Sequence, residues 1–331
     1  MLKAAVIGCG GIAGAHVPGW QAVRAAGAAE IVALCDTSDE CLTRLAESLG
    51  NPDLPRYHDW QQLLAEQELD AVDICLPHHL HAPAILDAAA RGVAVLCEKP
   101  LCMSLAEAEQ ISGAVKQHGI TLMCAHNQLF FPAIRHLRDE IEKGTIGEVQ
   151  QVVSADCFRT QRTREEWGWR ADLKTAGGGV LIDTGYHPTY RLLHMAGSEP
   201  VAVTAMMQNY HAPIEGEDTA HVLVRFANQA LGEIHTSWAF PMAVGAWQVS
   251  VFGSEGALFG RGNDFLHKPY HGEATQLSLE SANGFAEEIK HFVDCLATGA
   301  TPIQTEVDGI NVLKLILGAY EAVRTGQTVT F

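Results

Sequence analysis

The sequence predicts two domains, an α/β domain with a doubly wound parallel sheet and then a strand-rich domain. In the first third, short apolar runs alternate with segments of helical period. After about residue 125 most segments are strand-like, and several alternate apolar with polar residues. Strands covered on both faces appear as continuous apolar runs, whereas a sheet with one covered face shows alternation. The length of 331 residues also suits two domains better than one.

The first domain is expected to contain five strands joined by helices. The strands are AAVIG, EIVALCD, AVDICLP, VAVLCEKP and ITLMCAHN. The helices cover about 12–26, 38–49, 80–91 and 105–118. Right-handed crossovers between such strands give a doubly wound sheet. Ser104 is a suitable N-cap for the helix at 105–118, and Gly119 is a suitable stop.

The second domain is expected to begin with a helix near 132–143 and then to consist mainly of strands. The strand-like segments are EVQQVVSADCF, PVAVTAMMQNY, TAHVLVRF, ALGEIHTSWAF, WQVSVFG and GALFG. A helical segment, GGGVLIDTGYHPTYRLLHMAG, interrupts them, and two helices follow, GFAEEIKHFVDCLATG and about 307–323. No low-complexity linker separates the halves, so the predicted domains are 1–124 and 125–331.

Composition argues against several classes of function. Acidic residues outnumber basic ones by 39 to 22, for a net charge of −17, which disfavours binding to nucleic acid or to an anionic membrane. No apolar run reaches the ~18–20 residues of a membrane-spanning helix, and the N-terminus lacks the features of a signal peptide. The nine cysteines include no CxxC pattern, which favours reduced thiols and a cytoplasmic location.

A glycine turn directly follows the first predicted strand. Gly8, Gly10 and Gly11 lead with Ile12 into a helix, and glycines at such a turn let a pyrophosphate approach the helix N-terminus. Asp36 closes the second strand, where a carboxylate would bind the ribose of an adenine dinucleotide and repel a 2′-phosphate. No arginine or lysine occupies the next two positions, so NAD is favoured over NADP.

The stretch VLCEKP ends a predicted strand with Glu98, Lys99 and Pro100. A proline fixes its own φ and biases the preceding residue away from helical angles. Lys99 is therefore part of a rigid turn or is aimed as a functional group. Because X–Pro is the linkage for which the cis form costs little, we predict a cis Lys99–Pro100 bond.

The segment PHHLHAP, residues 77–83, places three histidines after another strand. No cysteine, aspartate or glutamate with metal-ligand spacing lies nearby in the sequence, so no metal site is predicted. A loop that faces the cofactor and starts a helix is the simpler interpretation.

The stretch GGGVLIDTGYH contains a second candidate group. Asp183 and His187 are four residues apart, so on a helix they would share one face. A histidine beside a carboxylate is a credible general base, because its ordinary pKa lies near neutrality. An ordinary pair on a helix surface is the alternative. The glycine triplet favours a site, since glycines permit close approach of the backbone to a ligand.

Taken in order, these motifs resemble the Gfo/Idh/MocA oxidoreductase family. The similarity includes the glycine turn, Asp36, the segment 77–81, EKP at 98–100, GTIGEV at 144–149, WR at 169–170 and GGGVLIDTGYH at 177–187. The family implies an N-terminal Rossmann domain and an α+β C-terminal domain with a large open-faced, mainly antiparallel sheet. It also implies oxidation or reduction of a secondary alcohol or ketone on sugars and cyclitols, and homodimers or homotetramers that pair through the sheet.

The resemblance also implies the site residues. The catalytic positions are Lys99, Asp183 and His187, and the substrate-binding positions are these three and Asn127. The cofactor-binding positions are Gly8, Gly10, Gly11, Ile12, Asp36, Pro77, His81, Glu98, Trp169 and Arg170. In these roles His187 accepts the hydroxyl proton, the Lys99 ammonium stabilises developing alkoxide and Asp183 orients the substrate. A non-catalytic dinucleotide-binding regulator of the same fold is the alternative function.

Residues 157–170, CFRTQRTREEWGWR, bear on the class of substrate. Arg159, Arg162 and Arg164 lie near Trp167 in the sequence. Tryptophan faces stack on sugars, and arginines bind carboxylates or phosphates. Alternatively, the two adjacent glutamates neutralise these arginines in a surface loop or subunit contact. We therefore favour a neutral hexose, cyclitol or keto-sugar over a charged sugar as the substrate.

Overall fold

The computed structural model describes residues 1–331, which form two compact units. The first unit combines residues 1–127 with 283–310, and the second combines 128–282 with 311–331. The chain first passes between units close to the boundary near residue 125 that the sequence predicts. The functional division at this boundary stays a prediction.

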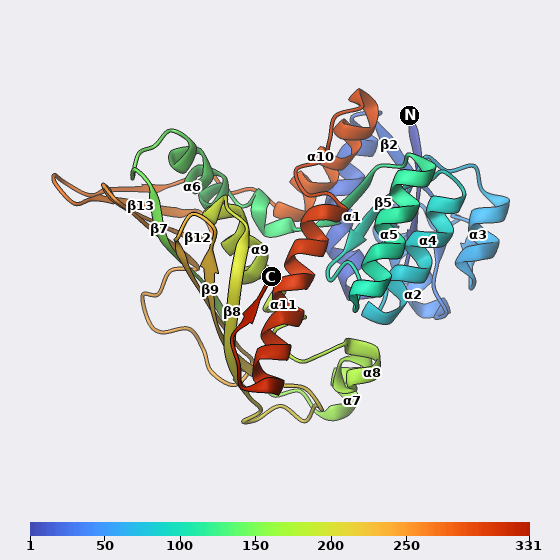
Figure 1. The fold of residues 1–331 in the computed structure, drawn as a ribbon. Helices are drawn as coiled ribbons and strands as arrows, with labels where there is room; N and C mark the ends of the chain where they lie inside the picture. The colour runs from blue at the N-terminus through green and yellow to red at the C-terminus, as the bar shows by residue number, and fades with distance from the viewer. The chain divides into compact units, whose positions relative to one another are not determined.

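Helix α10 (Gly284–Thr298) explains why a late segment belongs to the first unit. It packs along α1 (Gly11–Ala25), and the two helices lie side by side in Figure 1. Their approach is close, since a Cβ at Gly19 would lie 2.7 Å from Ile289 Cδ1. Sequence analysis assigns this helix to the second domain because periodicity predicts that a helix forms and not which layer it joins.

Six parallel strands form the sheet of the first unit, in the order β3-β2-β1-β4-β5-β6. The strands are β1 (Leu2–Ile7), β2 (Ala29–Cys35), β3 (Arg56–Tyr57), β4 (Ala71–Ile74), β5 (Ala94–Glu98) and β6 (Leu122–Ala125). The other helices are α2 (Asp39–Ser48), α3 (Trp60–Glu66), η1 (His78–Leu80), α4 (His81–Ala90) and α5 (Leu105–His118). Strand order reverses between β1 and β4, which confirms the doubly wound sheet. Helices α4 and α5 pack together over this sheet (Figure 1).

The predicted caps of α5 are both present. The Ser104 hydroxyl accepts the Glu107 N–H at 3.2 Å, and the Glu107 carboxylate accepts the Ser104 N–H at 3.1 Å. Gly119 ends the helix with a φ of +64°, a left-handed conformation that glycine adopts without strain. Sequence analysis does not expect β3 or α3, because a two-residue strand and a seven-residue helix give weak periodic signals.

Nine strands form the sheet of the second unit, in the order β14-β13-β12-β11-β7-β10-β9-β8-β15. The strands are β7 (Val149–Cys157), β8 (Pro200–Gln208), β9 (Thr219–Phe226), β10 (Leu231–Ser237), β11 (Val249–Gly253), β12 (Gly256–Arg261), β13 (Asp264–Pro269), β14 (Thr275–Ser278) and β15 (Val329–Thr330). β7 and β10 pair in parallel, and the other neighbours are antiparallel. The mainly antiparallel sheet is therefore confirmed, with β13, β14 and β15 added to the expected strands.

The remaining helices are short except for two that pack on this sheet and one near the C-terminus. They are η2 (Asn127–Phe130), α6 (Pro132–Glu142), α7 (Arg164–Trp167), η3 (Gly168–Ala171), α8 (Leu173–Ala176), α9 (Tyr186–Ala196) and α11 (Glu306–Thr325). Residues of α11 contribute to both units. None of the helices combines the length and the apolar composition needed to cross a bilayer.

One face of the nine-stranded sheet is covered and the other is open. Helix α9 packs against β7 and β10, and α6 packs against β12 and β13 (Figure 1). On β9 the exposed side chains of His221 and Leu223 alternate with buried ones. Met206 on β8 lies opposite His221 in register and is 82% exposed. This alternation confirms the open-faced sheet.

A buried arginine fastens α9 to the sheet. Arg191 is fully buried, and its Nη1 lies 3.0 Å from Asp156 Oδ2. It also donates to the Ser154 hydroxyl, the Ala155 carbonyl oxygen and the Gln128 side chain. A buried guanidinium needs partners for its several N–H groups, and β7 with the start of η2 supplies them. The position of α9 therefore depends on polar as well as apolar contacts.

The acid Glu288, on α10, is fully buried and unpartnered. Neither of its carboxyl oxygens has a hydrogen-bond partner. Burial raises the pKa of Glu288 well above its ordinary value, because it disfavours the charged form. In the unfolded chain the same acid ionises near pH 4.5. Above that pH the folded state holds the extra proton, so this residue makes stability fall as pH rises.

We therefore expect Glu288→Met to raise the free energy of unfolding by about 1–3 kcal/mol near pH 7, because it removes two unpartnered polar atoms. The gain should shrink as pH falls through 4.5, because the acid of the unfolded chain then takes up its proton as well. Denaturant titrations at several pH values measure it. The matched control is Glu109→Met on the exposed surface of α5, which should change stability by less than about 0.5 kcal/mol. An unchanged or reduced stability of Glu288→Met at pH 7 contradicts the expectation.

Candidate cofactor and catalytic sites

The glycines of the turn at 8–11 differ in their surroundings. Gly8 is packed against the protein, whereas Gly10 and Gly11 border open space, which we call the open cradle. Gly8 has a φ of +95°, and a Cβ there would lie 2.5 Å from the Cys75 carbonyl oxygen. At Gly10 and Gly11 no protein atom lies within 4 Å of the corresponding Cβ position. Helix α1 begins at Gly11 without a side-chain cap, so its first N–H groups face this open space. The turn fits an anionic group such as a pyrophosphate.

Asp36 lies beside this turn at the end of β2. Its Oδ2 accepts the Cys9 N–H at 2.7 Å, and its Oδ1 accepts the Ser38 N–H at 2.8 Å. Sequence analysis misses a nearby cation, because Arg44 is eight residues further along on α2. The Arg44 Nη2 lies 3.5 Å from the Cys9 carbonyl oxygen, so the guanidinium reaches back to the glycine turn. Asp36 and Arg44 are thus the charged groups that bear on the choice between NAD and NADP.

Glu98 and Lys99 leave the end of β5, and the Lys99–Pro100 bond is cis, as predicted. Glu98 is 5% exposed. Its Oε1 lies 3.1 Å from His16 Nε2, and its Oε2 accepts the Lys99 backbone N–H at 3.1 Å. Glu98 therefore contacts the protein with both oxygens, and its contact with a cofactor stays a prediction.

His81 holds two loops together. Its Nδ1 lies 2.6 Å from the Pro100 carbonyl oxygen, and its Nε2 lies 2.7 Å from the Leu76 carbonyl oxygen. Burial lowers the pKa of His81, and the two carbonyl oxygens act in the opposite direction. The ring connects the turn after β4, where Pro77 precedes η1, to the loop after β5. A direct contact of Pro77 or His81 with the cofactor is an untested expectation.

Three buried groups of the first unit have potential metal-ligand atoms close together. The atoms of His16, Asp73 and Cys75 lie within 4.8 Å of one another. His16 Nδ1 is 2.9 Å from Asp73 Oδ2, and the Cys75 Sγ is 3.5 Å from Asp73 Oδ1. Burial raises the pKa of the Cys75 thiol, and the three side chains are joined by hydrogen bonds through Asp73. Hydrogen bonds therefore account for this group.

The glycine-rich loop of the second unit corrects one interpretation of the sequence. Its glycines approach the protein itself. Gly178 packs against the Tyr320 hydroxyl, and a Cβ on Gly179 would lie 2.5 Å from the Glu217 backbone nitrogen. Glu217, which sequence analysis misses, accepts the Gly179 N–H at 3.1 Å and the Leu181 N–H at 2.9 Å. The Tyr320 hydroxyl donates to the same carboxyl group at 2.9 Å.

Asp183 lies in the turns that precede α9, because the helix begins only at Tyr186. The expected helix over the whole stretch is therefore shorter, since Glu217 holds the backbone of 179–181. Asp183 is 8% exposed, and its Oδ2 accepts from Arg170 Nε at 2.7 Å. The Arg170 guanidinium carbon lies 4.2 Å from the Trp169 ring centroid. Asp183, Arg170 and Trp169 thus form one connected group.

His187 lies in the first turn of α9. Its Nδ1 is 2.8 Å from the Tyr190 hydroxyl, which also accepts the Gln128 N–H at 3.2 Å. If Nδ1 carries the proton and donates to Tyr190, Nε2 is left with a lone pair and can act as a base. Tyr190 is buried and was not predicted. Its spacing of three residues from His187 on a helix was the available signal.

The arginines of 159–164 have protein partners. Arg164 Nη2 lies 2.5 Å from Asp172 Oδ1, and Arg159 Nη1 donates to the Ala239 carbonyl oxygen at 3.3 Å. The Arg162 guanidinium carbon lies 5.3 Å from the Trp167 ring centroid. These contacts show no cluster of arginines arranged around an anion.

The predicted substrate residue Asn127 follows β6 and is 5% exposed.

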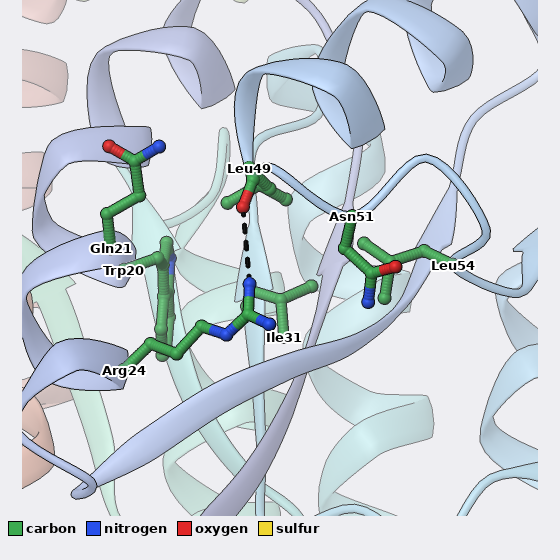
Figure 2. Close-up of a pocket in the computed structure, with 7 residues that line it drawn as sticks. All are labelled: Trp20, Gln21, Arg24, Ile31, Leu49, Asn51 and Leu54. Atoms are coloured by element: carbon green, nitrogen blue, oxygen red, sulfur yellow. Dashed lines mark hydrogen bonds between the residues drawn. The ribbon is translucent and has the colours of Figure 1, made fainter.

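One small pocket lies elsewhere in the first unit, against α1 and β2. Figure 2 shows its lining, which consists of Trp20, Gln21, Arg24, Ile31, Leu49, Asn51 and Leu54. The Arg24 Nη1 lies 3.4 Å from the Leu49 carbonyl oxygen. The lining includes no carboxylate, hydroxyl or thiol, and none of the predicted site residues. The pocket is therefore a poor candidate for the catalytic site.

For the glycine-rich loop we expect Gly179→Ala to lower the free energy of unfolding by about 2–3 kcal/mol, because the new methyl group overlaps the Glu217 backbone. Denaturant unfolding measures the change. Gly113→Ala is the control, since this exposed glycine of α5 has no atom near its Cβ position and alanine there should stabilise by ~0.5–1 kcal/mol. Equal stability of Gly179→Ala and the wild type contradicts the tight contact.

Comparison with known proteins identifies the family of both halves of the chain. Residues 2–126 match the family described as "Oxidoreductase family, NAD-binding Rossmann fold", and residues 134–259 match the "GFO/IDH/MocA C-terminal domain". The chain is 30% identical over 316 residues to 1,5-anhydro-D-fructose reductase of Ensifer adhaerens, with 92% of each chain covered. It is 25% identical to scyllo-inositol 2-dehydrogenase (NAD(+)) of Bacillus subtilis, covering 99% of this chain and 96% of the relative.

A solved structure shows the same fold over the full length. This is the aldose-aldose oxidoreductase from Caulobacter crescentus, with a TM-score of 0.87, 25% identity, and coverage of 100% of this chain and 99% of that one. Both halves of the chain thus match one family in the same order. The chain belongs to the Gfo/Idh/MocA family of oxidoreductases, with an NAD(P)-binding Rossmann fold in its N-terminal part.

Proposed function

We propose that this chain transfers a hydride between NAD and a secondary alcohol or ketone of a sugar or cyclitol. The observation that carries the proposal is the open cradle at Gly10 and Gly11, at the N-terminus of α1, in the same sheet as the Glu98–Lys99 loop. The named relatives support the substrate class, since one is a reductase of an anhydro-sugar and another a dehydrogenase of an inositol. We also propose a homodimer or homotetramer that pairs through the open sheet face.

In this proposal a bound nicotinamide supplies the hydride acceptor for oxidation. A carbinol carbon loses hydride only as its hydroxyl loses a proton. We assign that proton to Nε2 of His187, with Nδ1–H donating to Tyr190. The ammonium of Lys99 stabilises the developing alkoxide, or polarises the ketone in the reverse direction. The proton then remains on His187 until it exchanges with solvent.

Asp183 is assigned an orienting role. Its carboxylate is paired with Arg170 at 2.7 Å, and a carboxylate held by a guanidinium is a weak base. It retains lone pairs that can accept a hydrogen bond from a substrate hydroxyl. The same pairing places Trp169 and Arg170 next to a candidate catalytic residue, which suits the contact with the cofactor that the resemblance implies.

The test of this function is turnover of a panel of monosaccharides and inositols with NAD. For a substrate that is oxidised, we expect His187→Ala to lower kcat by ~10²–10⁴-fold and to leave NAD affinity nearly unchanged. The wild-type rate should rise with pH through one ionisation near neutrality, and this ionisation should vanish in His187→Ala. His118→Ala, at an exposed position of α5, is the control and should keep wild-type rates.

Two results would contradict these assignments. If the ionisation persists in His187→Ala and disappears in Lys99→Ala, lysine is the base. If no sugar or cyclitol is turned over while NAD binds, the proposed function is wrong.

The second prediction concerns cofactor choice. We expect kcat/KM to favour NAD over NADP, because a 2′-phosphate would meet the Asp36 carboxylate. Asp36→Asn keeps the side-chain shape and an oxygen to accept a backbone N–H, and removing the charge should reduce the preference by about tenfold or more. Arg44→Ala tests the opposing cation and should weaken NADP more than NAD. A wild-type preference for NADP contradicts the assignment of Asp36.

A further inference from the structure

The first unit contains a buried polar cluster, defined here as His16, Asp73 and Glu98, that directly joins the Lys99 loop. All three side chains are at most 5% exposed. They come from three elements, with His16 on α1, Asp73 on β4 and Glu98 at the end of β5. The proposed reaction gives no role to His16 or Asp73. Burying three ionisable groups is costly unless each is paired and hydrogen bonded.

Hydrogen bonds connect the cluster from end to end. The Trp20 indole N–H donates to Asp73 Oδ2 at 2.7 Å, and His16 Nδ1 lies 2.9 Å from the same oxygen. On the other side of the ring, His16 Nε2 lies 3.1 Å from Glu98 Oε1. Glu98 Oε2 then accepts the Lys99 backbone N–H at 3.1 Å. The series therefore ends on the peptide group of the candidate catalytic lysine.

The geometry at His16 suits a proton on both ring nitrogens. Each nitrogen faces a carboxylate oxygen, and an ionised carboxylate only accepts hydrogen bonds. Burial alone would lower the pKa of His16, but attraction and hydrogen bonding from Asp73 raise it well above its ordinary value.

The other groups that face His16 are a thiol, a carboxyl group with a raised pKa and an aromatic ring. Burial raises the pKa of Cys75, whose Sγ is 3.9 Å from His16 Nδ1, and raises the pKa of Glu288 on α10. The Phe285 ring centroid, also on α10, lies 5.5 Å from that of His16. Thus Asp73 and Glu98 are the charged partners of the imidazolium. Because its pKa is higher in the folded than in the unfolded state, its stabilisation is complete below about pH 6.5 and is lost as pH rises through the folded pKa.

We propose that His16 is a positioning residue, a buried imidazolium that holds Glu98 in contact with the Lys99 amide, so that the Lys99 loop has one conformation. Asp73 keeps the imidazolium charged and oriented, and Trp20 orients Asp73. The link to catalysis rests on the proposed function of Lys99. The inference that the cluster holds the loop does not depend on that function.

The consequence is a loop held by charge-assisted hydrogen bonds. Without His16, two carboxylates would be buried a short distance apart without a counterion, and one would take up a proton. A protonated Glu98 is a weaker acceptor for the Lys99 N–H, because hydrogen bonds to an ionised acceptor are about twice as strong as neutral ones. Removing the charge should therefore loosen the backbone of the loop before it unfolds the sheet.

The experiment uses the full-length, cofactor-free protein labelled with ¹⁵N-lysine and ¹⁵N-histidine. The chain has eight lysines, so the Lys99 amide can be followed beside reference amides such as Lys116 in α5. We expect the wild-type His16 ring to keep both protons well above the pH at which an ordinary histidine titrates. We expect His16→Gln to speed exchange of the Lys99 amide by about tenfold or more relative to Lys116.

Glu288→Gln is the matched control. Glu288 is also buried and faces His16, but its carboxyl group makes no hydrogen bond to His16, Asp73 or Glu98. The substitution should leave exchange of the Lys99 amide unchanged. Asp73→Asn is the second variant in case His16→Gln does not fold. The oxygen of the introduced amide can still accept the Trp20 and His16 Nδ1 N–H groups, so the charge of Asp73 is removed and a neutral His16 has no Nε2 proton to donate to Glu98. In this variant the His16 ring should titrate, and protection of the Lys99 amide should fall as pH rises through neutrality.

The outcomes separate this inference from the proposed function. A wild-type His16 that titrates near pH 6.5, or unchanged protection of the Lys99 amide in folded His16→Gln and Asp73→Asn, overturns it. Both measurements need no substrate, so a failed substrate screen bears only on the proposed function. With an active enzyme, His16→Gln should lower kcat at least about tenfold while KM for NAD stays nearly constant, and an unchanged kcat overturns the link to Lys99.

Discussion

The first unit depends on the parallel pairing of β1, β4 and β5. Because neighbouring parallel strands end at one edge of a sheet, their pairing brings together the glycine turn, the segment at 75–81 and the loop after Glu98. The approach is close enough that Gly8 cannot carry a Cβ beside the Cys75 carbonyl oxygen. The His81 ring then joins the loop after β4 to the loop after β5, because its nitrogens lie at hydrogen-bond distance from the Leu76 and Pro100 carbonyl oxygens. Strand pairing thus sets the position of every candidate cofactor group in this unit.

Local signals predicted much of the fold. The capping box of Ser104 and Glu107, the stop at Gly119 and the cis Lys99–Pro100 bond each depend on residues close in sequence. Alternation on the strands likewise predicted a sheet with one open face. Helix α3 and strands β13 to β15 were missed, since short or exposed segments have weak periodicity. The assignment of 283–310 failed because it depends on α1 packing against α10.

The sequence predicted the motifs of the candidate sites but not the hydrogen-bond networks that hold them. Asp183 and His187 were predicted from the glycine-rich motif and its family resemblance, whereas the observed contacts of Arg170, Glu217 and Tyr190 follow from the tertiary structure. His16 is 57 residues from Asp73 and 82 from Glu98, and no periodic pattern connects such positions. The glycine triplet shows the same limit. Its sequence indicates close approach, and the structure shows that the approaching group is Glu217 and Tyr320 of the same unit.

In each unit an acidic side chain, buried in the first and half-buried in the second, accepts hydrogen bonds from the backbone of a candidate catalytic loop. In the first, Glu98 accepts the Lys99 N–H, and in the second, Glu217 accepts the Gly179 and Leu181 N–H groups that precede Asp183. Loop backbones carry N–H groups that no helix or sheet satisfies, and burying them unpaired costs about 1–3 kcal/mol each. A carboxyl group has two oxygens, so it can accept hydrogen bonds from two or more backbone N–H groups at once. The cost of burying each acid is offset by partners, His16 for Glu98 and Tyr320 for Glu217. Precision in these loops therefore comes from side chains outside the motifs, and substitutions there should alter the motifs' chemistry without touching their residues.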